Sequence, residues 1–457
     1  MKPIEEMTIE ELEISCGLVE VDEDVDEDNL RCWIDCANES INDFPIQNLP
    51  FGVFSRKETP NDHTIGVAIG DRIIDLKRAI RAKLLCDLPP EVQQALSKST
   101  LNAFMAMGPK IWENTRYLLQ RLMNEKSSIL RDNEELRYMI MVPMTDVDMH
   151  LPFKIGDYTD FYTSENHARN VGKRFRPNNP LMPNFKHLPV AYHGRASSVV
   201  VSGTDIVRPK GQILESGAEA PVYKPSELLD YEIELGAVVG AGNPLGQPIA
   251  MADVADHLFG MVIINDWSAR DVQKWEYQPL GPFNGKNFAT STSPWVVTLE
   301  ALKPYRVPGP PRKEGDPETL DYLKSEEDWA LDITVEVYLS SEKMREQKMA
   351  PLLLSKGNFE GMYWTIAQML VHHTSSGANL RTGDLLGSGT ISGETDDSKG
   401  SLLEIVEPGS KGIELPDGTM RRALQDGDEV ILRAYAYKEG KPRIGFGECR
   451  GIVVQPR

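Results

Sequence analysis

Short runs of apolar residues, separated by Gly, Pro and Asn, dominate the chain from His150 onward. Such runs with turn residues between them predict the strands of a β-sandwich, barrel or roll rather than those of a parallel α/β sheet. The proline-rich and charged segment 303–324 interrupts them and predicts a long surface loop. The predicted strands span residues 198–203, 231–240, 259–264, 295–299, 331–339, 429–437 and 451–454.

The region before His150 combines a predicted hairpin with a helical stretch. Residues 65–76 form two short apolar runs across a Gly70-Asp71 turn, which predicts a β-hairpin. Apolar residues between Thr100 and Leu122 recur at helical spacing. The fold class expected is therefore mainly β, with a small domain of strands and helices over residues 44–149 and a larger β domain over residues 150–457.

Residues 1–43 are set apart by their charge. The 457-residue chain carries a net charge of -20, and this segment supplies about -13 of it, from 15 acidic and two basic residues. A dense acidic run such as residues 19–28 repels itself and cannot bury enough apolar surface to become ordered. We expect residues 1–43 to be a largely disordered extension, and a solvated tail is favoured over a segment that binds a partner.

Composition also disfavours several classes of partner and location. An acidic chain without a basic stripe repels phosphate backbones, so no nucleic acid is expected. The apolar runs are too short to cross a bilayer, and the N-terminus has neither a secretory signal nor the character of a transit peptide. The five cysteines form no CxxC pair, which predicts reduced thiols without a disulfide framework. A soluble cytoplasmic protein with no membrane partner is expected.

Four carboxylates lie in apolar or aromatic settings, where acids are normally avoided. Asp160 belongs to an aromatic cluster, Glu232 and Glu234 alternate along one predicted strand, and Asp266 ends another. Two glutamates on one strand are more often a solvated sheet face, but the two aspartates favour a functional site. Because the ligands are carboxylates, they fit Ca²⁺ or Mg²⁺ better than zinc, and calcium is the first choice.

Several residues nearby are suited to catalysis. His167 follows Asp160 by about two helical turns and is the candidate general base, although a lone histidine is usually structural. His193, His372 and His373 compete for that role and fit a structural one better. After Asp266 a predicted helix presents one face rich in hydrogen-bond donors, and a loop bracketed by glycines follows it. The alternative to a functional role is that both are an ordinary surface helix and loop. The helix face holds Arg270, Gln273 and Tyr277, the loop holds Lys286 and Thr290, and the Gly-rich segment 381–393 could form a substrate wall.

From about Phe44 to the C-terminus the chain resembles the fumarylacetoacetase family. The resemblance rests on GDYTDFY (156–162), LPVAYHGRASSVVVSG (188–203), NDWSARDVQKWEYQPLGPF (265–283) and GDLLGSGTISG (383–393). It implies a C-terminal β-roll catalytic domain preceded by a small Src-homology-3-like β-barrel with helices, and a homodimer. The implied reaction is hydrolysis of 4-fumarylacetoacetate, a dicarboxylic diketone, to fumarate and acetoacetate, the last step of tyrosine and phenylalanine catabolism.

The resemblance also implies roles for individual residues. His167 takes the position of the general base, Glu404 that of the acid which orients it, and Arg270, Gln273 and Lys286 those that stabilise the oxyanion. The implied calcium ligands are Asp160, Glu232, Glu234 and Asp266. The implied substrate contacts are Tyr162, Arg176, Tyr192, Gln273, Tyr277 and Thr390. A neighbouring structural magnesium site is implied at Asp266, Lys286 and Thr290.

The chain departs from the family at Ala289, which replaces a glycine of the pattern GKSFGTT. If that glycine needs a positive φ, the magnesium site is in question. Two alternatives to the implied function stay open: a related decarboxylation or hydration of a β-keto acid, and a catalytically silent calcium-binding interaction protein that works through its acidic extension. The first alternative would release carbon dioxide or another product in place of fumarate and acetoacetate. For the second, deletion of residues 1–43 is the test, because the hydrolase should keep its activity without them.

Overall fold

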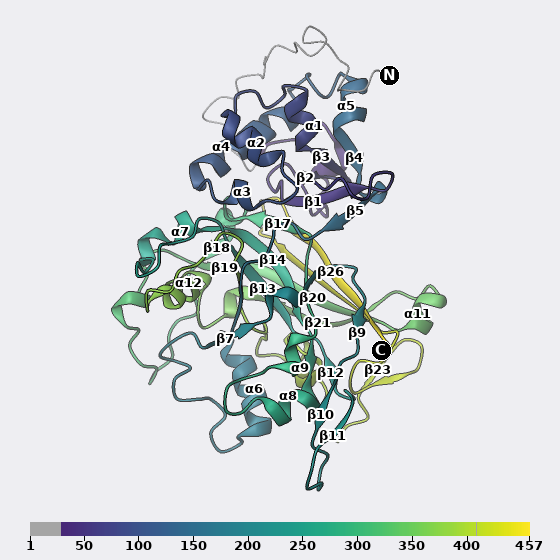
Figure 1. The fold of residues 1–457 in the computed structure, drawn as a ribbon, viewed down its shortest axis with the longest axis vertical. Helices are drawn as coiled ribbons and strands as arrows, with labels where there is room; N and C mark the ends of the chain where they lie inside the picture. The colour runs from purple at the N-terminus through teal and green to yellow at the C-terminus, as the bar shows by residue number, and fades with distance from the viewer. Residues whose placement is uncertain (1–28, 408) are drawn as a thin grey trace.

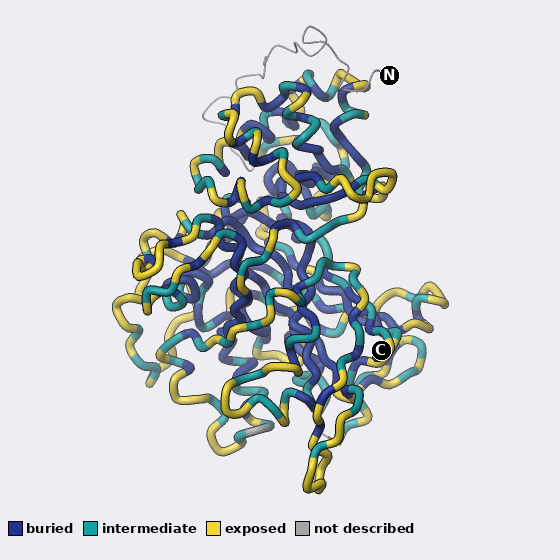
Figure 2. Tube along the Cα trace, in the orientation of Figure 1, coloured by how far each residue is buried: buried dark blue, intermediate teal, exposed yellow. Residues whose placement is uncertain are grey.

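The computed structural model describes residues 29–407 and 409–457. Figure 1 shows a smaller body, formed by the first part of the described chain, seated on one end of a larger and sheet-rich body. A 13-stranded sheet runs through both bodies. Figure 2 shows that the strands at the centre of the larger body are buried, whereas the exposed segments are mostly loops at the periphery.

The smaller body is built on the predicted hairpin, which is confirmed. β2 (Thr64–Ile69) and β3 (Arg72–Asp75) pair antiparallel across the Gly70-Asp71 turn. Their neighbour β1 (Phe51–Arg56) also pairs with β17 (Trp295–Thr298) of the larger body, so hydrogen bonds join the two bodies. At the junction a Cβ on Gly52 would lie 2.6 Å from the Trp295 ring, which explains why glycine is needed there. The sheet is completed by β4 (Met141–Pro143) and β5 (Val147–His150).

The helical stretch predicted over residues 100–122 is two helices. α3 (Asn102–Met105) ends before Gly108, whose φ of 86° is in the left-handed region, and α4 (Pro109–Met123) begins with a proline. Proline is favoured in the first turn of a helix because its missing N–H needs no partner there. The apolar face of α4 is buried in the core of the smaller body. The other helices there are α1 (Leu76–Arg81), α2 (Pro90–Leu96) and α5 (Glu134–Ile140).

The larger body contains two extended sheets that share one hydrophobic cluster. In the first, the strand order is β17-β14-β13-β22-β6-β7, with β16 and β8 beside this path, and in the second it is β21-β20-β25-β26-β9. Most pairs are antiparallel, as expected for a β-rich chain, and three pairs are parallel. The first sheet comprises β14 (Leu258–Asp266), β13 (Ile233–Val239), β22 (Leu385–Gly387), β6 (Tyr158–Phe161), β7 (Ala191–Gly194), β16 (Thr290–Thr292) and β8 (Val199–Val201). The second comprises β21 (Leu352–Asn358), β20 (Ile333–Ser340), β25 (Glu429–Ala436), β26 (Ile444–Val454) and β9 (Ile206–Val207).

Short helices and two-stranded ribbons surround these sheets. Four ribbons are formed by β10 (Lys210–Ile213) with β11 (Val222–Pro225), β12 (Leu229–Asp230) with β15 (Ser268–Ala269), β18 (Arg306–Val307) with β19 (Ala330–Leu331), and β23 (Ile413–Glu414) with β24 (Met420–Arg421). The helices are α6 (Glu165–Phe175), α7 (Val254–His257), α8 (Arg270–Glu276), α9 (Asn284–Asn287), α10 (Leu299–Leu302), α11 (Glu342–Glu346), α12 (Ile366–Thr374) and α13 (Leu402–Ile405).

The prediction that residues 1–43 are disordered is wrong for residues 29–43, which the structure describes. Residues 29–43 are ordered: Cys32 and Ala37 are buried, and Trp33 and Ile34 pack against the core of the smaller body. Asp43 accepts a hydrogen bond of 2.8 Å from Arg443. The physical reason is composition, because apolar residues follow the acidic run and give this segment surface to bury. Residues 1–28 of the expected extension lie outside the described residues.

The composition also led to expectations about membrane-spanning segments and about the cysteines. Within the described part of the chain, no helix is long and apolar enough to cross a membrane.

Cys32, Cys36 and Cys449 are free thiols, as expected, but Cys86 is disulfide-bonded. The prediction of reduced thiols was therefore wrong at Cys86. Pairing depends on which cysteines the fold brings within reach, and spacing in the sequence does not show that.

Candidate active site

A cavity of about 400 Å³ in the larger body gathers most of the residues expected from the sequence. Its wall combines parts of β6, α6, α8 and α9 with the residues just before and within β13, which are far apart in the sequence. Asp266 and Glu404 are not part of the lining but contact residues that are. The expected residues in the wall are Asp160, Tyr162, His167, Arg176, Tyr192, Glu232, Glu234, Arg270, Gln273, Tyr277, Lys286 and Thr390.

Strand register brings three acids together. β22 pairs with β6 so that Gly387 lies opposite Asp160, and it pairs with β13 two residues after Glu234. A Cβ on Gly387 would lie 2.9 Å from a Glu234 oxygen and 3.3 Å from an Asp160 oxygen. Glycine at this position therefore leaves room for two carboxylates to converge. Asp266 reaches the same place from the end of β14, next to β13 in the sheet.

Asp160, Glu234 and Asp266 form an acidic triad suited to a cation. All three are buried, and each offers an oxygen within 4.8 Å of those of the other two. Each also has a buried oxygen that finds no hydrogen-bond partner among the residues that the structure describes. Burial, strengthened by repulsion from neighbouring acids, raises the pKa of Asp160 and Glu234 well above the usual range. Buried acids that share a site need protons or a cation, and this all-oxygen set fits a hard divalent cation.

Glu232 lies beside the acidic triad but is paired with cations. Its carboxylate accepts a hydrogen bond of 2.7 Å from Arg270 and contacts the Lys286 ammonium. Burial alone would raise its pKa, but Arg270 and Lys286 outweigh burial and hold the pKa well below the usual range. The structure therefore places Glu232 between two cations, at the edge of the acidic triad.

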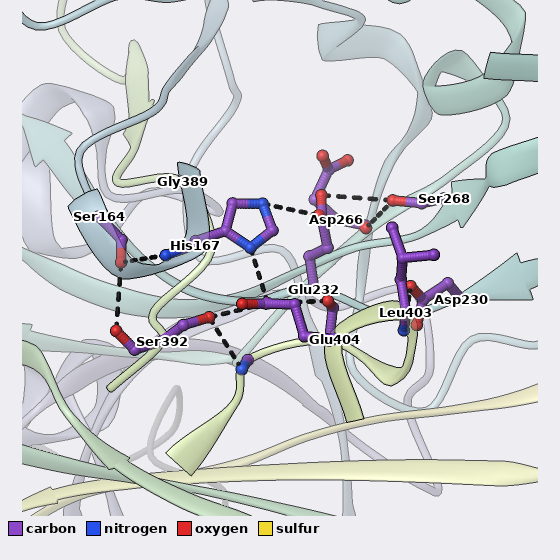
Figure 3. A network of polar contacts seen from close by, with 12 residues as sticks. Ser164, His167, Asp230, Glu232, Asp266, Ser268, Gly389, Ser392, Leu403 and Glu404 are labelled. Atoms are coloured by element: carbon purple, nitrogen blue, oxygen red, sulfur yellow. Dashed lines mark hydrogen bonds and ion pairs between the residues drawn. The ribbon is translucent and has the colours of Figure 1, made fainter. Parts of the chain in front are cut away.

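His167 and Glu404 form a hydrogen-bonded dyad (Figure 3). Nδ1 of His167 lies 2.7 Å from a Glu404 oxygen, and Nε2 faces Glu232 at 3.5 Å. Glu404 also accepts hydrogen bonds of 2.8 and 2.9 Å from Ser392 and Ser401. Burial would raise the pKa of Glu404, but His167 and the hydrogen-bond donors lower it to about 2. An ionised carboxylate thus fixes Nδ1 and leaves Nε2 for chemistry.

Cationic and amide donors line the cavity next to the dyad. Arg270 and Gln273 lie on α8, where the guanidinium donates to the Gln273 side-chain oxygen at 3.3 Å. Lys286, on α9, contacts both Glu232 and Asp266. Burial opposes their charge, but the neighbouring acids raise the pKa of both Arg270 and Lys286, so the two side chains stay cationic. The predicted donor-rich helix face is thus present and faces the cavity.

The remaining expected residues complete the wall in different ways. The Tyr162 ring packs edge-on against His167 with centroids 5.3 Å apart, and the Tyr192 hydroxyl donates to Asp266 at 3.1 Å. Arg176 directly follows α6, and its buried Nε has no hydrogen-bond partner in the described chain. Thr390 follows Gly389, whose N–H donates to Glu234 at 3.1 Å. The competing histidines His193, His372 and His373 are absent from the described lining.

Two kinds of functional residue escaped spacing arguments. Glu404 lies 237 positions after His167, and only the family resemblance pointed to it. Asp230 is bonded to Arg270 at 2.9 Å and was not singled out. The signal for Asp230 was available, because it precedes Glu232 by two positions and so extends the alternation of acids along that segment.

Ala289 does not need to be glycine. Outside the masked positions, the non-glycine residues with positive φ are Leu49, Lys83 and Lys348, so Ala289 has an ordinary backbone. We expect Ala289→Gly to lower the unfolding free energy by about 1 kcal/mol, because glycine gains freedom in the unfolded chain and a buried methyl is lost. The urea unfolding midpoint measures this, and an increase in that midpoint would instead indicate strain at Ala289.

Comparisons with known proteins cover both bodies. Residues 47–152 match the family described as Fumarylacetoacetase N-terminal, and residues 157–454 match Fumarylacetoacetate (FAA) hydrolase C-terminal. Human fumarylacetoacetase is 50% identical over 423 residues, which are 92% of this chain and 98% of that protein. The Caenorhabditis elegans fumarylacetoacetase is 50% identical over 417 residues, 90% of this chain and 96% of that protein. The Arabidopsis thaliana fumarylacetoacetase is 46% identical over 426 residues, 93% of this chain and 98% of that protein.

Proposed function

The chain belongs to the fumarylacetoacetase family and hydrolyses fumarylacetoacetate, and we propose that the His167–Glu404 dyad and a divalent metal on the acidic triad carry out this reaction. The observation that supports the proposal is the 2.7 Å bond of the dyad at the wall of the cavity that also holds the triad. The expected sheet-rich fold, an N-terminal domain followed by a C-terminal catalytic domain, is confirmed. The boundaries 44–149 and 150–457 are proposed, since β5 ends at His150 and β6 begins at Tyr158.

The dyad supplies the base of the reaction. Cleavage of a 1,3-diketone by water needs an activated water, a stabilised oxyanion and a way to accept the leaving enolate. With Nδ1 fixed by ionised Glu404, His167 takes a proton from water at Nε2. Arg270, Gln273 and Lys286 then donate to the oxygen on which negative charge develops. His167 can return its proton to the leaving carbon or its enolate oxygen.

The metal would be held by Asp160, Glu232, Glu234 and Asp266, and calcium is the proposed ion. When bound, it supplies Lewis-acid polarisation of the diketone oxygens. The implied magnesium site fits less well. Of its expected residues, Asp266 alone has a carboxylate and Lys286 is itself a cation, whereas magnesium needs several oxygen ligands. No step is therefore assigned to magnesium.

Substrate binding is proposed to use the cation and hydroxyl groups of the wall. Arg176 has a buried guanidinium nitrogen without a partner in the described chain and is suited to a substrate carboxylate. Tyr162, Tyr192, Tyr277 and Thr390 supply hydroxyls around the cavity. With this substrate the chain would act in tyrosine and phenylalanine breakdown, and a cytoplasmic location is proposed with it.

Product analysis tests the proposed reaction directly. Incubation with 4-fumarylacetoacetate should release fumarate and acetoacetate in equal amounts, and a chelator should suppress both. Release of carbon dioxide would instead indicate the related β-keto acid chemistry. Deletion of residues 1–28 should leave turnover intact, because the catalytic and metal residues of the proposed reaction all lie between Asp160 and Glu404.

A homodimer is proposed through a surface that includes Tyr223 and Trp275, both exposed large side chains. Trp275 donates to Gln212 at 3.2 Å, and Gln212 lies opposite Tyr223 in the β10–β11 ribbon. Exposed apolar side chains that gather in this way are typical of protein interfaces.

We expect sedimentation velocity to give about twice the 51.1 kDa chain mass for the wild type and the single-chain mass for Tyr223→Asp, because the substitution would bury a charge in the interface. Tyr138→Asp is the matched control, since Tyr138 is also 73% exposed but lies on α5 of the smaller body. A dimer that survives Tyr223→Asp, or dissociates equally with Tyr138→Asp, would contradict this interface.

A further inference from the structure

Asp230 is a buried acid just behind the cavity wall. It ends β12, is 3% exposed, and is absent from the described lining of the cavity. Burial raises its pKa, and the cationic Arg270 and hydrogen-bond donors oppose that rise. An ionised carboxylate in such a place needs several partners, and the structure supplies them on two sides.

The first set of partners is the start of α13. Oδ1 of Asp230 accepts from the Leu402 N–H at 2.8 Å, and Oδ2 accepts from the Leu403 N–H at 3.0 Å. The first N–H groups of a helix have no partner within the helix. The residue before α13, Ser401, does not cap them, because its hydroxyl donates to Glu404 instead. Asp230 therefore caps this helix from a distant segment, and Figure 3 shows its side chain beside Leu403.

The second partner is Arg270. Its Nε and Nη2 lie 2.9 and 2.8 Å from Oδ2 of Asp230, and Nη2 also lies 2.7 Å from Glu232. Two buried carboxylates thus hold the Nε–Nη2 edge of the guanidinium, while Nη1 donates to the Gln273 side-chain oxygen. Without Asp230, Glu232 would be the one acid bonded to Arg270 in the described chain, and the guanidinium would be free to turn toward it.

We propose that Asp230 is a positioning residue that sets the Glu404–His167 dyad and the Arg270 guanidinium relative to each other. Glu404 is the third residue of α13, so its direction depends on how the start of that helix is held. One carboxylate thereby fixes both the base of the reaction and a donor to its oxyanion. The inference rests on the proposed function for its kinetic consequence, but its structural part does not.

The test is Asp230→Asn, which keeps the size of the side chain. The amide has one acceptor oxygen, so its NH₂ group must face either the Leu402 N–H or both the Leu403 N–H and Arg270. We expect kcat for fumarylacetoacetate to fall about a hundredfold with KM changed less than about threefold, because the groups displaced act on the transition state. Calorimetric metal affinity should fall less than kcat, by under about tenfold, since Asp160, Glu234 and Asp266 are untouched and Glu232 alone of the proposed ligands shares Arg270 with Asp230.

A spectroscopic measurement separates positioning from general damage. The Nδ1 proton of His167 in its bond to Glu404 should give a low-field proton resonance that His167→Gln removes. Asp230→Asn should shift or broaden that resonance. The matched control is Asp428→Asn, because Asp428 is also buried, pairs with an arginine and accepts a backbone N–H, but lies away from the cavity. It should leave both the resonance and kcat unchanged.

The outcomes are distinguishable. An unaltered resonance in Asp230→Asn, or equal losses of kcat in Asp230→Asn and Asp428→Asn, would overturn the inference. Absence of fumarate release by the wild type would overturn the proposed function instead. The resonance would still report whether Asp230 holds the dyad, because that measurement needs no turnover.

Discussion

His167→Ala is expected to lower kcat for fumarylacetoacetate about a hundredfold to ten-thousandfold, the usual contribution of a general base. His167 is the one histidine among the described residues of the cavity wall, and its Nδ1 is already bonded to Glu404. Alanine leaves the donors Arg270, Gln273 and Lys286 in place, so some catalysis by oxyanion stabilisation should persist. Fumarate formation measured at saturating substrate gives the effect.

Three comparisons make this prediction specific. Glu404→Gln should cost less than His167→Ala, because the amide keeps the shape of the side chain but loses the charge that fixes the imidazole. His193→Ala should leave turnover near normal, since His193 is absent from the described cavity lining. Metal affinity should be unchanged in all three variants. Near-normal turnover by His167→Ala, with the metal bound and the fold intact, would refute the dyad as the source of the base.

The strands of this fold could be predicted because their residues obey local rules. The hairpin over residues 65–76 has alternating apolar runs and a Gly-Asp turn, and the structure pairs it as expected. The helical stretch was harder, since Gly108 and Pro109 end one helix and begin the next within a continuous apolar pattern. The order of residues 29–43 was missed because the acidity of the preceding run hid the few apolar residues that pack.

The chemistry of the site could be recognised from residue types, but the hydrogen bonds that join its residues could not. Acids in apolar settings pointed to the triad because burial of a carboxylate is costly without a partner. Glu404 and Asp230 obey no such local rule. His167 lies 237 residues before its partner Glu404, and Leu402 lies 172 residues after its partner Asp230. Only the three-dimensional path of the chain brings these groups together, so spacing shows neither set of partners, although the alternation with Glu232 marks Asp230 itself.

The charges of the site require either a bound cation or protons on the acidic triad. The acidic triad, Asp160, Glu234 and Asp266, has three buried carboxylates, and of the two buried cations nearby Arg270 is bonded to Asp230 and Glu232. Lys286 is shared between Glu232 and Asp266. One shared ammonium cannot neutralise the acidic triad, which is why burial and repulsion raise the pKa of Asp160 and Glu234 so far.

Removal of the metal is expected to abolish turnover and to lower the melting temperature in a pH-dependent way. A carboxyl group whose pKa is raised by folding stabilises the protein while protonated, and that contribution is lost as pH rises through the folded-state pKa. The melting temperature of metal-free protein should therefore fall as pH rises above the ordinary range of Asp and Glu. The metal-loaded protein should change less, so the difference between the two should widen from pH 5 to pH 8.

Asp160→Asn provides the decisive control, because it should change stability and function in opposite directions. With one repelling carboxylate removed, the metal-free variant should melt above metal-free wild type at pH 8. Its metal affinity and its turnover should both fall, since a ligand is lost. Differential scanning calorimetry and chelator competition measure the two effects. If chelation leaves both turnover and melting temperature unchanged at pH 8, the acidic triad does not hold a metal and its carboxylates must be neutralised by protons.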